Sequence, residues 1–143
     1  MPVSSQFPFI ERTSVMKDGI SGLSLVASLV PAVVTATTKG SHADLQGYNA
    51  ATLIITTGAI AGDGVFDVKL QHADTTADGD FTDVAAADLL GTLPAVLEAD
   101  TVCKQGYKGT RRFLRAVITR TSGTSIAAAA ILVLGHPHDA PVA

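Results

Sequence analysis

The chain has 143 residues, of which 47% are apolar and 5% aromatic, and it carries a formal net charge of −3. This length suits one domain that buries roughly 68–70% of its unfolded surface, so folding requires neither a metal nor a disulfide. The small negative charge predicts no general affinity for nucleic acid. The single cysteine, Cys103, excludes an internal disulfide.

The N-terminus lacks the basic segment and apolar run of a secretory signal. The longest apolar run, residues 126–134, is too short to cross a bilayer as a helix, which takes about 20 residues. We therefore expect no membrane contact, and a protein that is made and kept in the cytoplasm or in something assembled there.

Residues 1–20 predict an extended N-terminal arm, because two prolines fix φ and bias the residues before them toward extended geometry. Phe7, Phe9 and Ile10 are apolar within an otherwise polar segment. Exposure of these apolar side chains to water is unfavourable, so we expect them to dock on this subunit or on a neighbour. The remaining residues, 21–143, are expected to form one domain.

The first part of this domain reads as strands joined by turns. Residues 22–38 are rich in Leu, Val and Thr, but Pro31 interrupts them, which predicts two short strands or edge pieces. Residues 39–47 form a turn-rich connection. Residues 51–57 are β-branched at five of seven positions, which predicts a buried strand, and a turn signal follows at 59–64.

The next part predicts a β-hairpin. Apolar and polar residues alternate over 65–72, which is typical of an antiparallel strand with one face in water. An Asp-, Gly- and Thr-rich loop at 73–80 leads to a return strand at 81–86. Residues 85–97 hold the single plausible helix, which a glycine and a proline limit to a turn or two.

Three further strands complete the prediction, at residues 102–107, 112–121 and 126–134, with an irregular tail from 135. Turn signals recur at the spacing expected of a sandwich or barrel. The sequence therefore predicts an all-β single domain, a β-sandwich or jelly-roll-like fold with an extended N-terminal arm and at most one short helix.

Charge is unevenly distributed, with acidic residues gathered in the hairpin and basic residues in a later segment. This separation predicts either pairs within one subunit, which is our default, or docking between subunits. The acidic set is Asp63, Asp67, Asp74, Asp78, Asp80, Asp83 and Asp88, and the basic set is Lys104, Lys108, Arg111, Arg112, Arg115 and Arg120.

No metal, cofactor or catalytic site is predicted. The loop from Asp74 to Asp83 could offer oxygens to calcium, but it lacks the EF-hand spacing, and turn geometry explains its composition. His136 and His138 lack two further zinc ligands. Cys103 has no histidine near it in the sequence, and no G-x-S-x-G elbow or acid–base pair occurs. We therefore expect that the protein is not an enzyme.

The segment 106–112 concentrates Lys108, Arg111 and Arg112 beside Tyr107. Such cations could contact phosphate, and Arg also pairs well with carboxylates. Because the chain has neither a phosphate-binding loop nor aromatics stacked along a strand, we favour a protein contact or a solvated loop over direct nucleic-acid binding.

Several stretches taken in order resemble small proteins that tailed bacteriophages and prophages encode among their head genes. These stretches are DLQGYNAATLIITTGAI (44–60), DVKLQHADTTADGDFTDVAAADLLG (67–91), KQGYKGTRRFLRAVIT (104–119) and the ending GHPHDAPV (135–142). We read that group as capsid decoration, or cement, proteins, so the chain resembles this family.

The resemblance implies a β-rich domain that binds the outside of an icosahedral shell, often as trimers, and stabilises it against the pressure of packaged DNA. It implies a major capsid protein and further copies of the chain as partners, a place on the outer capsid surface after assembly in the bacterial cytoplasm, and no active-site residues. Our candidates for capsid or subunit contact are Phe7, Phe9, Ile10, Lys108, Arg111 and Arg112.

Two other interpretations remain open. A tail or head–tail junction protein could have the same β-rich sequence. A glycan-binding module on the virion is also possible, because jelly-roll sandwiches host glycans, although the absence of Trp and the presence of only two Tyr leave few stacking platforms.

Overall fold

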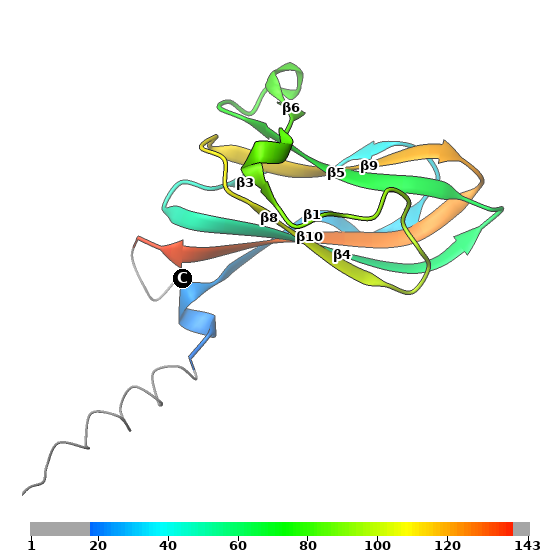
Figure 1. Cartoon of the computed structure of the whole chain (residues 1–143), viewed down its shortest axis with the longest axis horizontal. Coiled ribbons are helices and arrows are strands. Elements are labelled where there is room, and N and C mark those ends of the chain that lie inside the picture. Colours follow the sequence, from blue (N-terminus) through cyan, green and yellow to red (C-terminus); the bar gives the residue numbers. More distant parts are fainter. Residues whose placement is uncertain (1–17, 139–143) are drawn as a thin grey trace, which may run out of the picture.

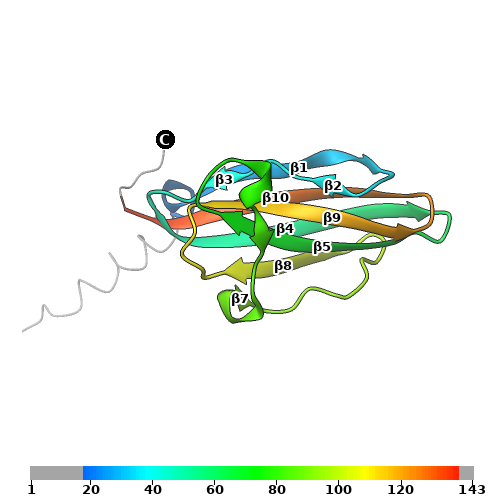
Figure 2. The same ribbon diagram turned by 90° about the horizontal axis from the view of Figure 1, so that it is seen from above.

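The computed structural model describes residues 18–138, which form a sandwich of two antiparallel sheets (Figures 1 and 2). Sheet A contains, in order across the sheet, β1 (Ser24–Val34), β10 (Ser125–Pro137), β4 (Tyr48–Ala61), β8 (Val102–Tyr107) and β7 (Leu89–Leu90). Sheet B contains β2 (Thr38–Lys39), β9 (Phe113–Ser122), β5 (Val65–Ala73) and β6 (Thr82–Asp83), and β3 (Ala43–Asp44) also pairs with β9.

The predicted all-β sandwich is confirmed. Within the described range, helical structure is limited to three 3₁₀ turns, η2 (Ile20–Gly22), η3 (Asp78–Asp80) and η4 (Ala86–Asp88). The domain boundary predicted at residue 20 falls in η2, and the part of the predicted arm before residue 18 lies outside the described residues.

The core lies between the two sheets and is built from alternate residues of the long strands. Phe66, Leu53 and Leu114 are fully buried there. Small residues such as Ala116 and Ala130 separate these large side chains, which lets the two layers approach closely. Alternation along β5 therefore follows the prediction, with the even-numbered residues from 66 to 72 buried, whereas every residue of β9 from 113 to 118 is buried.

Ser28 joins the two sheets at one edge. Its hydroxyl donates to the Ser41 carbonyl at 2.7 Å and accepts from the Ala116 N–H at 3.0 Å. The Gly40 N–H donates to the Ala116 carbonyl at 2.8 Å. A Cβ at Gly40 would lie 2.6 Å from the Ser28 carbonyl oxygen and 2.7 Å from that of Ala116, so glycine is required where the β2–β3 connection passes between Ser28 of sheet A and Ala116 of sheet B.

The prediction of two short strands or edge pieces around Pro31 is confirmed in placing them at a sheet edge and wrong in dividing them at the proline. One strand, β1, runs through Pro31 with register shifts on both sides of Leu29. It lies at the edge of sheet A, where a residue that lacks an N–H costs no hydrogen bond within the sheet.

Three other predicted boundaries need correction. The return strand of the hairpin is only the two-residue β6, because the chain leaves the sheet after pairing Asp83 with Gln71. The predicted helix at 85–97 is only the turn η4 followed by β7. The tail stays regular to Pro137, because β10 continues its pairing with β4 as far as Tyr48.

Candidate functional site

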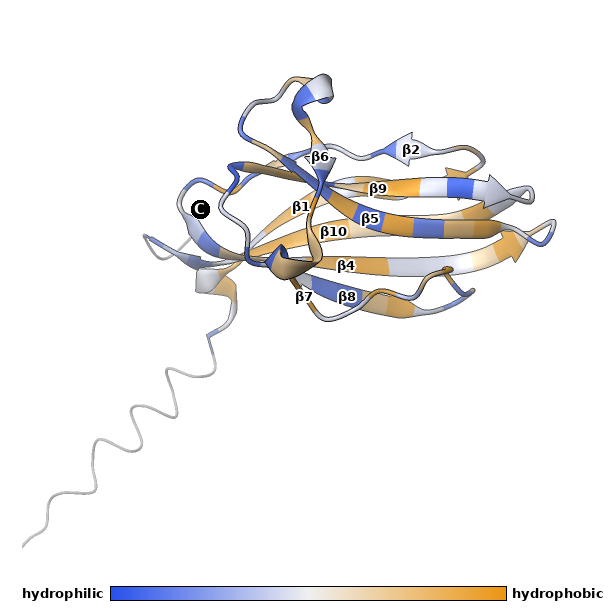
Figure 3. Cartoon of the chain, turned by 45° about the horizontal axis from the view of Figure 1, so that its top comes forward, coloured by the Kyte–Doolittle hydropathy of each residue, from blue (hydrophilic) through white to orange (hydrophobic). Residues whose placement is uncertain are grey.

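The outer face of sheet A is apolar and almost without charge. Its three long neighbouring strands, β1, β10 and β4, contain no Asp, Glu, Lys or Arg. Hydrophobic colour therefore runs along β10 and β4 in Figure 3, whereas β5 carries hydrophilic bands. A solvent-facing sheet surface normally alternates with polar residues, so this face differs from an ordinary wet face.

The strand register places apolar residues side by side on this face. Leu25 pairs with Val133, and in the next outward row Ala27 pairs with Ile131, which pairs in turn with Ile54 of β4. Leu25 is 65% exposed and Ile131 36% exposed. Further large apolar side chains exposed on strands β1 and β8 are Val30, Val33 and Val102.

Two shallow hollows shape this surface. One, of about 390 Å³, lies where Pro31 and Val33 of β1 approach Gly58 of β4 and Ala127 of β10. The other, of about 450 Å³, lies at the opposite end of β1, near Leu23 and Val133. A Cβ at Gly58 would lie 3.2 Å from the Ala127 side chain. The small residues Gly58 and Ala127 therefore leave the first hollow open.

The outer face of sheet B is covered by the chain's own acidic loop. The Arg115 guanidinium donates from Nη1 to Asp78 Oδ1 at 2.7 Å, and from Nε and Nη2 to Gln71 Oε1 at 3.1 and 2.8 Å. It also lies 4.1 Å from the ring centroid of Phe81. Arg115 is consequently only 6% exposed, although its strand position faces outward.

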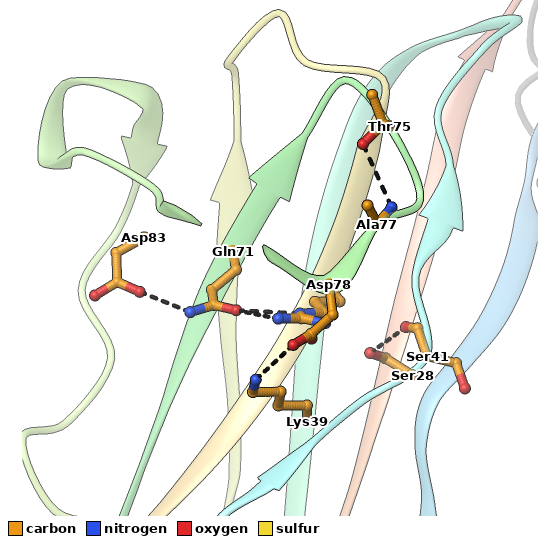
Figure 4. Close-up of polar contacts among 9 residues, drawn as sticks. Ser28, Lys39, Ser41, Gln71, Thr75, Ala77, Asp78 and Asp83 are labelled. Atoms are coloured by element: carbon orange, nitrogen blue, oxygen red, sulfur yellow. Dashed lines mark hydrogen bonds and ion pairs between the residues drawn. The ribbon is translucent and has the colours of Figure 1, made fainter. Parts of the chain in front are cut away.

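The other charges of this network are paired as well (Figure 4). Lys39 Nζ lies 2.9 Å from Asp78 Oδ2, and Asp83 accepts from both Gln71 and Lys69. Hydrogen bonds from Lys39 and Arg115 lower the pKa of Asp78, and those from Gln71 and Lys69 lower the pKa of Asp83. The loop carboxylates thus face cations and amides of the same chain.

The predicted contact cations lie close to this network. Arg111 Nη1 lies 3.0 Å from Asp74 Oδ2, and Arg112 binds both carboxylate oxygens of Asp44 at 3.0 and 2.8 Å. Arg111–Asp74 and Arg115–Asp78 therefore pair the separated basic and acidic sets within one subunit. The Lys108 side chain is exposed and forms no salt bridge with residues 18–138.

Phe7, Phe9 and Ile10 lie outside the described residues, so the structure places only the three cations among the predicted contacts. The role of all six candidates in capsid or subunit contact stays a prediction.

A cleft of about 430 Å³ lies at one end of the sandwich, between the β3–β4 connection and the β8–β9 loop. Arg111 and Arg112 line it together with Tyr48, Tyr107 and His138. The hydrogen bond from Arg112 lowers the pKa of Asp44, so that carboxylate stays charged against the guanidinium. Both guanidinium groups of the cleft therefore already have a carboxylate partner.

His72 and Tyr107 form a polar contact inside the sandwich, with Nδ1 and Oη 2.8 Å apart. The Tyr107 hydroxyl oxygen accepts from the Arg111 N–H at 3.2 Å, which leaves its proton free to be donated to Nδ1. Burial, with a smaller contribution from the Arg111 charge, lowers the pKa of His72. The pair is satisfied as a neutral bridge between β5 and β8.

Across residues 18–138, no three side chains of His, Cys, Asp or Glu are grouped so that they could hold a metal ion. The same stretch contains no helix with the length and apolar character needed to span a membrane.

Sequence reasoning missed the outer face of sheet A, although its signal was present. Segments 24–34, 48–61 and 125–137 are long and free of charged residues. We interpreted residues 51–57 as a buried strand, because an apolar run predicts burial without telling which faces are covered.

Comparisons with known proteins identify no family. No protein family model and no curated protein matches the sequence. The structure of the SPBc2 prophage-derived protein YomS matches with a TM-score of 0.44 and 11% identity, over 78% of this chain and 94% of that one. A structure of infectious bursal disease virus, Gx strain, matches with a TM-score of 0.42 and 12% identity, over 83% of this chain and 35% of that one. Both scores are too low to bear on function.

Proposed function

We propose that the protein is a structural virion protein that binds the outer surface of an icosahedral phage capsid and stabilises it by bridging capsid subunits. The observation that carries this proposal is the outer face of β1, β10 and β4, whose strands contain no Asp, Glu, Lys or Arg and on which Leu25, Val33 and Ile131 are exposed. A contiguous apolar patch on a soluble subunit marks a surface that another protein covers.

A binding role accounts for the polar groups better than a catalytic one. Arg115 and Asp78 are held by each other, and the two arginines of the end cleft are held by Asp74 and Asp44. His72 bonds to Tyr107 inside the sandwich. In this proposal the protein acts through surface shape and is not an enzyme, and the structural partner of each of these groups supports it.

The resemblance of residues 44–60, 67–91 and 104–119 to decoration proteins supports a capsid as the partner surface. In this role the major capsid protein and other copies of the chain, as a trimer, are the partners, and neither nucleic acid nor membrane is contacted. Contacts after the first become effectively intramolecular on a lattice, so weak individual contacts suffice. Binding only to the assembled shell stabilises that shell by mass action.

The test mixes the purified full chain with phage heads that lack it, and follows sedimentation, electron microscopy and the temperature at which heads release DNA. We expect labelling across the whole shell and a higher release temperature. Labelling at a single vertex would instead indicate a tail or head–tail junction protein. No attachment together with a glycan-array signal would indicate a glycan-binding module.

Removal of residues 1–17 tests the arm in the same assay, because it leaves every described residue in place. We expect the domain to fold with unchanged circular dichroism and to bind heads about tenfold or more weaker, since multivalent contacts are lost. The matched control is Lys108→Ala in the full chain, which removes one candidate contact and keeps the arm. If the truncated chain still saturates heads, the arm has no part in attachment.

A further inference from the structure

We propose that the hollow of about 450 Å³ beside η2, on the outer face of sheet A, holds residues 7–10 of the same chain, with Phe7, Phe9 and Ile10 as apolar anchors. This inference goes beyond the proposed function, because it concerns a contact within one subunit. The contact fixes the segment to its own sandwich and leaves residues 1–6 available to a partner.

This η2 hollow lies on the outer side of sheet A, because its floor residues alternate with buried core residues. Ala50 and Thr52 of β4 and Val133 and Gly135 of β10 form the floor, and they are paired across the two strands. A Cβ at Gly135 would lie 3.7 Å from Leu23 Cδ2, so the Leu23 side chain lies against this floor. Among residues 18–138, those that line the hollow include no Asp, Glu, Lys or Arg.

The first described residues lie at the rim of this hollow. Gly19 and Gly22 line it, and η2 lies against β10, at the end of the sandwich where β1 begins (Figure 1). Asp18 accepts hydrogen bonds from the Ser21 N–H at 3.1 Å and the Ser21 hydroxyl at 2.7 Å, which fixes this turn. The segment before Asp18 therefore starts beside the hollow of its own copy.

The side chains around the hollow match the anchors in chemistry. Ile20 of η2 is 84% exposed and Leu23 is 45% exposed, and Leu25 is exposed in the next outward position of β1. Residues 7–10 contain two Phe and one Ile and carry no charge. Aromatic side chains bury large apolar areas and are the usual anchors of a protein contact. Docking removes both apolar sets from water together.

Reach restricts the segment to this end of the face. Ile10 and Phe7 precede Asp18 by stretches that span at most about 26 and 36 Å, at about 3.3 Å per residue. Because the hollow begins at Gly19, residues 11–17 can turn back and seat the anchors there without full extension. The 11 residues of β1 span about 36 Å on the same scale, so the hollow at Val33 stays open to a partner.

The short connection favours the same copy over a second one. A site reached through a short flexible linker meets its ligand at an effective concentration in the millimolar range, so in micromolar solution a second copy's segment is about a thousandfold more dilute. Closing so short a loop costs little more than closing a tight turn. The connection contains Glu11, Arg12 and Lys17, which suit a solvated loop.

Disulfide trapping tests whether the segment and the hollow belong to one copy. The full chain carries Pro8→Cys, which keeps all three anchors, and Thr52→Cys in the floor, with Cys103→Ser to remove the native thiol. It is oxidised with oxidised glutathione and followed on non-reducing denaturing gels. We expect a link within the chain, seen as a monomer of altered mobility that has lost both free thiols.

The matched control replaces Thr52→Cys by Val96→Cys. Val96 is exposed in the connection between β7 and β8, in which Asp100 bonds to Gly58 of the other hollow. We expect the floor variant to form its link about tenfold or more faster than the control, because docking raises the effective concentration of the two thiols. Covalent dimers would place the segment on a second copy and overturn the proposal. Equal rates would overturn it as well.

A tryptophan reporter gives a second measurement, because the chain contains no Trp. We expect Phe9→Trp in the full chain to give blue-shifted emission that persists as dilution yields monomers, followed by light scattering. Adding Leu25→Asp should move the emission to the red, whereas adding Val96→Asp should not, with circular dichroism unchanged in both. If Leu25→Asp fails to fold, Leu25→Ser replaces it.

Red emission from Phe9→Trp alone overturns the proposal, and so does a blue shift that disappears on dilution. The proposed function fails by a different result. A chain that labels phage heads but forms no internal link removes this inference and keeps the proposed function, whereas an internal link in a chain that ignores heads does the reverse.

Discussion

The two outer faces of the sandwich differ in whether the chain itself covers them. On sheet B, the loop from Asp74 to Asp83 lies over β9, and Arg115 pairs with Asp78 beneath Phe81. On sheet A, no described segment covers the aliphatic side chains of β1 and β10, and Ile131 and Leu25 remain exposed. The charged face is covered from within the chain, whereas the apolar face of β1, β10 and β4 stays open among the described residues.

The physical reason lies in the cost of leaving each kind of group without a partner. A guanidinium shielded from water is strongly unfavourable unless it is hydrogen-bonded and paired, so the face that carries Arg115 requires Asp78 and Gln71 for folding itself. Exposed aliphatic side chains do not prevent folding, and they gain free energy whenever a partner removes them from water. Substitutions on sheet B should therefore affect stability, and those on sheet A should affect assembly.

The largest expected loss of stability follows from Arg115→Ala. This change removes the hydrogen bonds to Asp78 and Gln71 and the stacking of the guanidinium on Phe81. We expect the free energy of unfolding, measured by urea denaturation, to fall by about 2–3 kcal/mol. Arg115→Lys keeps the charge but not the planar fork, and should fall between wild type and alanine.

The matched control is Arg112→Ala, which also breaks an arginine–carboxylate pair. Because both Arg112 and Asp44 are exposed, water replaces the lost contact and the decrease should be clearly smaller. Equal losses for the two alanine variants would mean that the covering loop does not shield Arg115.

For sheet B, the sequence predicted the alternation of inward and outward residues. It did not predict that the loop from Asp74 to Asp83 covers part of the outer face. Alternation over 65–72 correctly assigned Asp67, Lys69 and Gln71 to the outer side. Arg115 of β9 also faces outward, yet it is buried, because Asp78 and Phe81 of a loop distant in sequence lie against it. Periodicity reports which side of a strand a residue faces, and says nothing about what lies above it.

The second prediction concerns the dependence of stability on pH. The titratable groups that determine it lie in the interior and on sheet B. His72 has a lowered pKa in the folded state, so the unfolded chain binds the proton more tightly. Its stabilising contribution is complete above the ordinary value of 6.5 and is lost as the pH falls below it. Asp78 and Asp83 have lowered pKa values too, so their contribution is complete above 3.8 and is lost below it.

We therefore expect the melting temperature to fall in two steps as the pH is lowered, in scanning calorimetry from pH 8 to 3. His72→Gln keeps a hydrogen-bonding group for Tyr107 and should remove the upper step alone. Asp78→Asn should weaken the lower step alone. An upper step that survives His72→Gln would assign it to another group.

The candidate site was harder to predict than the fold because a surface has no motif. Lys108, Arg111 and Arg112 stood out as charges, yet the structure pairs both arginines within the subunit. The face of sheet A stood out less, because Ile131 and Leu132 belong to one apolar run although only Ile131 is exposed. Which side of such a run is covered depends on the number and order of the layers, and these arise from pairing between distant segments.

The smallest expected effect on stability is at Ile131, where assembly should nevertheless change most. A lysine there can extend into water from the outer face, so Ile131→Lys should alter the free energy of unfolding by no more than about 0.5 kcal/mol. In size-exclusion chromatography the same variant should lose its oligomer, because an ammonium group would then lie within the apolar contact. If Ile131→Lys destabilised the monomer as much as Arg115→Ala does, sheet A would be a part of the folded interior that needs its cover in order to fold. The contrast between the two faces would then have no physical basis, since both would require completion for stability.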